Sequence, residues 1–210
     1  MKKLTDLISF LAIFLLLGIN ANAEEKTIDL LTSEELELNS RWTLKDGILF
    51  PSEKPGKVIW SKQKFTNFEL TLEYKTSEKC NSGVFFRADP NNYVQGGFEI
   101  QVASKGMYNG KHVVGSLYGA KEPSSIEVKP DGEWNSMKLT CNGPKIIVVL
   151  NGKEILNLNI DDWKTAQKNP DGTKNKFKTA LKDLPRTGNI GFQYHGHPVW
   201  YRNVSIKKLK

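Results

Sequence analysis

Short runs of alternating apolar and polar residues dominate the chain from residue 42 onward. The clearest run is 68–74, in which apolar and polar side chains follow one another with period two, as in a β-strand with one buried face. Asn151-Gly152, between two such runs, is typical of a two-residue hairpin turn. No segment keeps a helical period over three turns, so the pattern predicts an all-β, antiparallel two-sheet sandwich, a jelly roll whose first strand pairs beside its last. Further runs of this kind lie at 42–44, 47–50, 58–60, 83–87, 97–102, 137–141, 145–150, 154–156, 189–194 and 200–209.

Two long stretches interrupt this rhythm of strands. The stretch 108–127 is rich in glycine, serine and proline, and 161–187 mixes lysines and aspartates with Trp163 and Phe177 as its few apolar anchors. Long loops in compact domains often bind ligands. The segment 161–187 is therefore either a solvated excursion at the surface or a lid over a pocket.

The first 23 residues have the pattern of a secretory signal peptide. Two lysines precede an apolar run at 7–19, and Ala21-Asn22-Ala23 is a typical cleavage site. We expect residues 1–23 to be removed, 24–210 to form a single domain, and the product to be exported to the periplasm or the medium. The apolar run is short for a membrane span, so we expect no membrane insertion.

Composition and charge narrow the function classes. The chain has 210 residues, 39% hydrophobic and 25% charged, with a net charge of +7 spread along its length, which argues for a globular domain and against a nucleic-acid partner. Sequence signatures of hydride transfer, phosphoryl transfer, serine hydrolysis and zinc proteolysis are lacking. Cys80 and Cys141 are either separate thiols or a disulfide in an oxidising compartment.

Polar residues that could perform chemistry occur on two of the predicted strands. Alternation along 97–102 places Glu99 and Gln101 on one face, where an acid and an amide together suit the hydroxyl groups of a sugar. Arg87 shares a face with Phe85 at the end of another strand, where an arginine is usually a salt-bridge partner. The alternative for all of them is an ordinary polar strand surface.

A second concentration of candidate residues lies near the C-terminus. His195 stands between glycines where a strand becomes a turn, and could act as a general acid or base. A metal site with His197, or a purely turn-stabilising role, are the alternatives. Tyr118, in a Gly-Ser-Leu-Tyr-Gly turn, is the best candidate for an exposed aromatic that stacks on a sugar ring.

Seven segments occur in an order that is typical of one family: 82–87, 97–102, 115–119, 132–135, 150–152, 188–196 and 198–204. Together they resemble the 3-keto-disaccharide hydrolase family. The resemblance implies a concanavalin-A-like jelly roll that bacteria export, acting on glycosides whose sugar carries a ketone at carbon 3. The chain departs from the family pattern at Tyr194 and after Gln101, where the family usually has aspartates. We expect no cofactor, a carbohydrate as the partner and no bound metal at the site, with a structural calcium ion left open.

Chemical reasoning from such a substrate assigns roles to the candidate residues. Glu99-Ile100-Gln101 lacks the second carboxylate that ordinary glycosidases need. A ketone at carbon 3 acidifies the hydrogen on carbon 2, so one base could start an elimination at carbon 1, followed by addition of water.

We therefore assign Glu99 or His195 as base and acid, Arg87 and Gln101 to the oxyanion and hydroxyls, and Tyr118 and Gln193 to the pocket wall. The alternatives are a non-catalytic carbohydrate-binding module or lectin on the same fold, or an accessory protein that docks partner enzymes. The sequence leaves the oligomeric state open.

Overall fold

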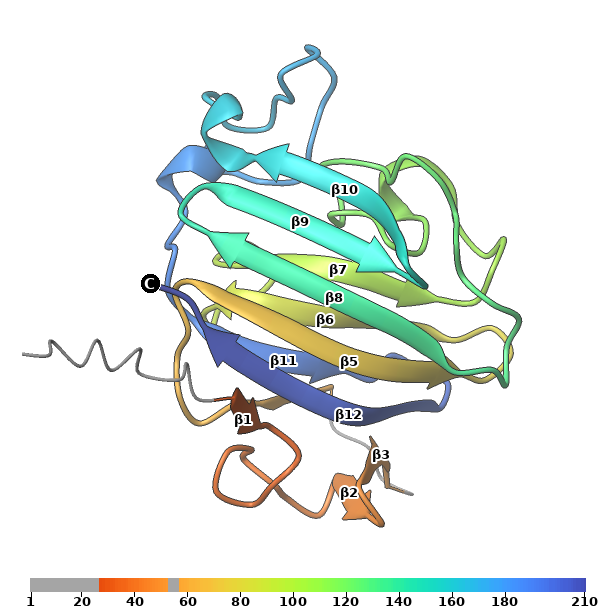
Figure 1. The fold of residues 1–210 in the computed structure, drawn as a ribbon. Coiled ribbons are helices and arrows are strands. Elements are labelled where there is room, and N and C mark those ends of the chain that lie inside the picture. Colours follow the sequence, from red (N-terminus) through yellow and green to blue (C-terminus); the bar gives the residue numbers. More distant parts are fainter. Residues whose placement is uncertain (1–26, 53–56) are drawn as a thin grey trace, which may run out of the picture.

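The computed structural model describes residues 27–52 and 57–210, which form two antiparallel β-sheets lying face to face (Figure 1). The larger sheet has the order β10-β9-β8-β5-β12-β3-β2, with β1 also paired to β12, and the smaller sheet has the order β4-β11-β6-β7. The predicted all-β sandwich of the jelly-roll type is confirmed. The strands are β1 (Thr27–Asp29), β2 (Trp42–Lys45), β3 (Ile48–Pro51), β4 (Val58–Trp60), β5 (Phe68–Thr76), β6 (Asn81–Ala88), β7 (Phe98–Ala103), β8 (Asn135–Asn142), β9 (Lys145–Leu150), β10 (Lys153–Asn159), β11 (Asn189–Gln193) and β12 (Val199–Lys208), and the short 3₁₀ helices are η1 (Gly110–His112), η2 (Ile160–Asp162) and η3 (Leu181–Asp183).

Local turn chemistry and the hydrophobic pattern explain the strand pairing. Asn151 and Gly152 both have positive φ, 49° and 86°, as a type I′ turn requires, and they connect β9 to β10. The predicted pairing of an early strand with the last one is also confirmed, since Thr27 lies opposite Lys207. Both ends of the described chain thus meet in the larger sheet.

The core lies between the sheets and contains the apolar positions of each alternating strand. Phe98, Ile100 and Val102 of β7 are fully buried there, and each such side chain contributes about 1.5–3 kcal/mol through burial. Because successive side chains of a strand point to opposite faces, the remaining residues of β7 lie on the outer face of the smaller sheet. The smaller sheet lies behind the larger sheet in Figure 1, so its outer face points away from the viewer.

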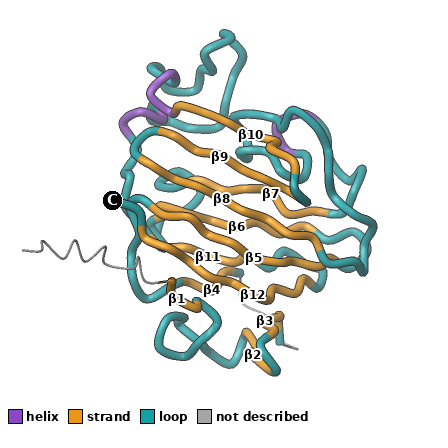
Figure 2. The backbone as a smooth tube through the Cα atoms, in the orientation of Figure 1, coloured by secondary structure: helices purple, strands orange, loops and turns teal. Residues whose placement is uncertain are grey.

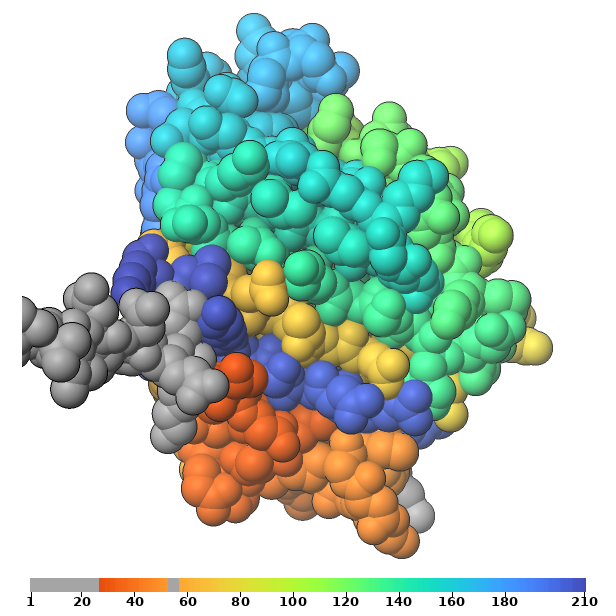
Figure 3. Space-filling model, in the orientation of Figure 1, coloured from red at the N-terminus to blue at the C-terminus, as the bar shows by residue number. Residues whose placement is uncertain are grey.

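Parts of the two long connections pack against the sandwich, while one loop of the second connection projects outward (Figure 2). Leu117 forms a bridge with Ile100, and the Gly115 amide donates to the Gln101 carbonyl, so part of the first connection continues the sheet beyond β7. In the second connection Trp163 and Phe177 are buried. The segment 161–187 is therefore anchored, although a part of it projects from the body of the molecule in Figure 3.

Both cysteines are buried free thiols in different parts of the sandwich. Cys80 precedes β6 and Cys141 belongs to β8. Burial raises the pKa of each thiol to about 12, so neither thiol ionises readily. The predicted signal peptide, residues 1–23, lies outside the described residues, and among those described no helix is long and apolar enough to cross a membrane.

Candidate functional site

Two glycines on the outer face of the smaller sheet make room for larger side chains to lie flat on it. A Cβ atom on Gly83 would come within 2.2 Å of the Glu99 Oε1, and one on Gly191 within 2.4 Å of the Trp60 ring. Both distances are far below any real contact, so a Cβ atom at either position would push the Glu99 carboxylate or the Trp60 ring aside. The Glu99 carboxylate consequently rests on β6, beside Gln101, which pairs with Gly83.

The carboxylate of Glu99 is nearly buried and has one cationic neighbour. The residue is 6% exposed, and Lys176 Nζ lies 3.8 Å from its Oε2. Burial raises the pKa of Glu99 to about 7, although the Lys176 charge acts in the opposite direction. Desolvation therefore outweighs the ion pair, and a carboxyl of this kind can both accept and release protons near neutral pH.

Tyr118 and Lys176 lie beside this carboxylate. The Tyr118 amide donates to the Glu99 carbonyl, and Lys176 Nζ lies 4.6 Å from the centre of the Tyr118 ring. The Tyr118 ring also contacts His112, with 4.9 Å between the ring centres. Burial, and then the charge of Glu99, raise the pKa of the Tyr118 hydroxyl, so this hydroxyl keeps its proton.

A chain of hydrogen bonds connects Gln101 with His195. Gln101 Nε2 donates to Asn81 Oδ1 at 3.0 Å, and Asn81 Nδ2 lies 3.0 Å from His195 Nδ1. The structure thus brings Glu99, Gln101, Tyr118 and His195, all predicted from the sequence, to one face. Gln193 belongs to the same face, since its neighbour Phe192 points into the core.

A family model described as the 3-keto-alpha-glucoside-1,2-lyase-like domain matches residues 25–207 of this sequence. The chain belongs to this family. The resemblance inferred from the seven sequence segments is thereby confirmed.

Individual relatives of this lyase-like domain are consistent with that result. A 3-keto-disaccharide hydrolase of Bacteroides thetaiotaomicron is 28% identical over 206 residues, covering 81% of this chain and 71% of the relative. A crystal structure from Parabacteroides distasonis, provisionally assigned as a glycosyl hydrolase, is 32% identical with a TM-score of 0.82, covering 88% of this chain and 100% of the other. A Bacillus subtilis protein with a galectin-like fold, 14% identical with a TM-score of 0.57 over 87% and 94% of the two chains, is similar in fold alone.

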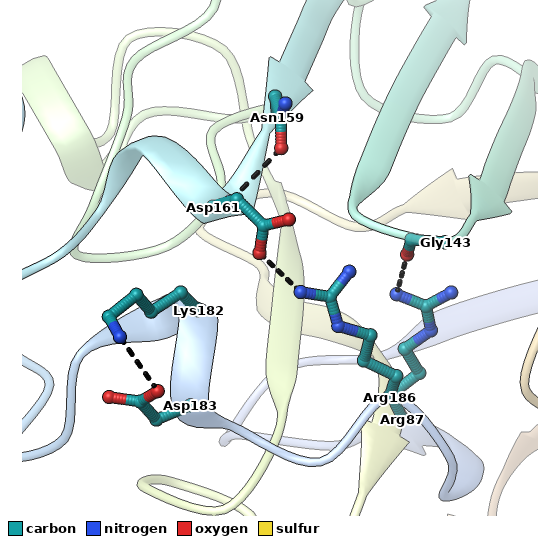
Figure 4. A network of polar contacts seen from close by, with 7 residues as sticks. All are labelled: Arg87, Gly143, Asn159, Asp161, Lys182, Asp183 and Arg186. Carbon is teal, nitrogen blue, oxygen red and sulfur yellow. Dashed lines mark hydrogen bonds and ion pairs between the residues drawn. The ribbon is translucent and has the colours of Figure 1, made fainter.

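The predicted placement of the Arg87 side chain on the outer face, beside Phe85, is wrong. A register shift between β6 and β11 and a φ of +47° at Arg87 break the alternation that would put its side chain beside Phe85. Arg87 is fully buried, and its guanidinium donates to the carbonyl of Gly143 (Figure 4) and also to the carbonyl of Thr66. Arg87 therefore connects loops at one end of the sandwich and does not reach the face with Glu99.

Two residues that lie beside Glu99 and His195 had no sequence signal that separated them from their neighbours. Lys176 is one of many lysines in the segment 161–187, and Asn81 is a polar residue at the start of a strand. Only the folding of distant segments onto β6 and β7 places them beside Glu99 and His195. Within 27–52 and 57–210, no group of three or more His, Cys, Asp and Glu residues could hold a metal ion.

Proposed function

We propose that this chain is a carbohydrate-acting enzyme that cleaves glycosides whose sugar carries a ketone at carbon 3. Its family membership supports the broader class. The observation that carries the specific reaction is Glu99, one nearly buried carboxyl with a pKa of about 7 beside the hydrogen-bonding amide of Gln101. A single base of this kind suits an elimination and does not suit the two-carboxylate mechanism of ordinary glycosidases.

The reaction begins when the Glu99 carboxylate removes the proton from carbon 2. The electrons of the broken C–H bond form a double bond between carbons 2 and 3, and the ketone oxygen becomes an oxyanion. When the ketone re-forms, the electrons shift to a double bond between carbons 1 and 2, and the bond from carbon 1 to the leaving oxygen breaks. The leaving oxygen takes up a proton, and addition of water to the new double bond completes a net hydrolysis.

The neighbours of Glu99 fit the charges that develop in this sequence. The Lys176 ammonium lies 3.8 Å from the carboxylate. It supplies the positive charge near the oxyanion, a role that the sequence had assigned to Arg87. Gln101 has an amide suited to sugar hydroxyls, and Tyr118 and Gln193 would line the sugar's binding surface. Glycosides of this type release a sugar and an aglycone, which makes the activity simple to measure.

The test uses 3-keto-trehalose or 3-keto-sucrose with the wild type and with Glu99→Gln. The variant should lose at least ~10²-fold in kcat, since it lacks the group that transfers the proton. Deuterium at carbon 2 of the substrate should slow the wild type through a primary isotope effect, because the C–H bond breaks in the first step. Glu154→Gln, which removes an exposed carboxylate on β10, is the matched control.

Three outcomes would contradict parts of this proposal. Equal rates in the wild type and in Glu99→Gln would exclude Glu99 as the base. Sugar release without an isotope effect at carbon 2 would argue for direct displacement at carbon 1. Binding of the 3-keto sugar without release would indicate a carbohydrate-binding module or lectin on the same fold.

We also propose that the protein is exported, on the strength of the signal-peptide pattern in residues 1–23. Expression of the full chain in a bacterial host should give a product that begins at Glu24 and is found outside the cytoplasm. Mass spectrometry of the intact product measures its first residue. A product that keeps residues 1–23 and stays in the cytoplasm would refute export.

A further inference from the structure

The hydrogen bonds of Asn81 restrict where His195 can carry its proton. Asn81 has a side-chain amide with one acceptor oxygen and one donor nitrogen. Its oxygen receives Gln101 Nε2 at 3.0 Å, so its nitrogen faces His195 Nδ1, also at 3.0 Å. Because an amide nitrogen only donates, Nδ1 must accept with its lone pair.

This arrangement determines the tautomer of the neutral ring. A neutral imidazole has one ring hydrogen, and a nitrogen that accepts a hydrogen bond does not carry it. The hydrogen of His195 therefore belongs on Nε2. A ring held in this form presents an N–H group to a ligand and has no free lone pair with which to remove a proton.

We propose that Asn81 is a positioning residue that holds His195 as the Nε2–H tautomer, so that His195 donates a hydrogen bond to the oxygen on carbon 3 of the substrate. This inference rests on the proposed function and deepens it, because the sequence left Glu99 and His195 as alternative bases. Glu99 is then the base, and His195 stabilises the oxyanion. No proton is transferred to or from the ring, and its hydrogen stays on Nε2 throughout.

The positions of these groups on the sheet fit this division of roles. Asn81 lies two residues before Gly83 on β6, and the Glu99 carboxylate rests on Gly83. Gln101 pairs with Gly83 and donates a hydrogen bond to Asn81, so its side chain lies on the same face. A sugar above Gly83 would have the carboxylate and the exposed imidazole near it. A neutral imidazole that polarises a carbonyl in this manner is an established catalytic device.

The first experiment reads the tautomer directly and needs no turnover. Protein with ¹⁵N-labelled histidine is observed by NMR at a pH where the rings are neutral, and His195→Gln identifies the signals of His195 among the three histidines. The proposal expects hydrogen on Nε2 and a bare Nδ1. The opposite tautomer in the wild type would overturn the proposal, whatever the substrate of the enzyme is.

The second experiment reverses the tautomer with Asn81→Asp. A carboxylate has no hydrogen to donate, so it accepts from Nδ1–H and leaves Nε2 bare. The variant should show the Nδ1–H tautomer and lose roughly 10²-fold in kcat on a 3-keto-disaccharide, as when one oxyanion donor is removed, with KM changed less than ~3-fold. The new charge at position 81 can shift the pKa of Glu99 and so move the limb of the pH profile. The kcat value is therefore read on the plateau of that profile, where this shift has no effect.

Asn142→Asp, an exposed residue of β8 in the larger sheet, is the matched control for the added charge. It should leave both the tautomer of His195 and kcat unchanged. Asn81→Asp with the reversed tautomer but wild-type kcat would show that the ring's donor plays no part in the reaction, and would overturn the proposed role. If neither protein releases sugar while the NMR result holds, then the proposed function fails and the tautomer assignment stands.

Discussion

Replacing Glu99 by Gln should change how the free energy of unfolding depends on pH, because burial raises the pKa of this carboxyl from 4.5 to about 7. Between these two pH values the folded chain keeps the proton on Glu99, whereas the unfolded chain has released it. Stability from this group is therefore fully present at low pH and is lost as pH rises through the window. At about 1.36 kcal/mol for each pKa unit, the loss is about 3 kcal/mol.

Urea unfolding followed by tryptophan fluorescence from about pH 4 to about pH 8 measures this effect. Glutamine does not titrate, so the unfolding free energy of Glu99→Gln should gain about 3 kcal/mol relative to the wild type across this range. The attraction between Lys176 and the ionised carboxylate is already contained in the pKa of about 7, so any difference between the two proteins that does not vary with pH has another cause, and the change with pH carries the result. Glu154→Gln shows how much any Glu→Gln substitution contributes.

Parallel curves for the wild type and Glu99→Gln would refute this reasoning. They would mean that Glu99 titrates in the folded chain as it does in the unfolded chain. Glu99 would then have no special ability to transfer protons near neutral pH, and the main support for its role as the base would be lost.

Three further substitutions test the parts of the site separately. Lys176→Met should move the acid limb of the kcat/KM profile about one to three pH units higher, since a charge at 3.8 Å is worth about 1–4 kcal/mol to the carboxylate; an unmoved limb would contradict this pairing. Gly83→Ala should push the Glu99 carboxylate aside and lower kcat at least ~10-fold, while thermal unfolding shows an intact fold; a wild-type kcat would mean that the position of the carboxylate is unimportant. Arg87→Met should lower the unfolding free energy by about 1–3 kcal/mol, because the carbonyls of Thr66 and Gly143 lose a charged donor, with kcat per folded molecule within ~2-fold; a selective loss of kcat would restore Arg87 to the reaction.

The alternation of residues along the chain was sufficient to predict the sandwich and one face of the site. Phe98, Ile100 and Val102 must face the core because their burial stabilises the fold. Pleating then puts Glu99 and Gln101 on the opposite face wherever the strand lies in the sheet. This part of the site could be read from the sequence because it depends only on neighbouring residues.

The same rule failed for Arg87 because a single extra residue in a strand reverses every later side chain. The bulge between β6 and β11 is a property of how two strands pair, and neither strand's own sequence marks it. An arginine expected on the outer face is instead fully buried with backbone carbonyls.

The sequence by itself determined the class of fold, the family and the face on which Glu99 and Gln101 lie, since each follows from local periodicity or from short ordered segments. Only the tertiary structure decided which groups surround that carboxylate. Lys176 reaches Glu99 from another segment, and His195 meets Asn81 across 114 positions of the chain. The pKa of Glu99 depends on these neighbours, because desolvation and neighbouring charge act between groups that are close in space but distant in the sequence.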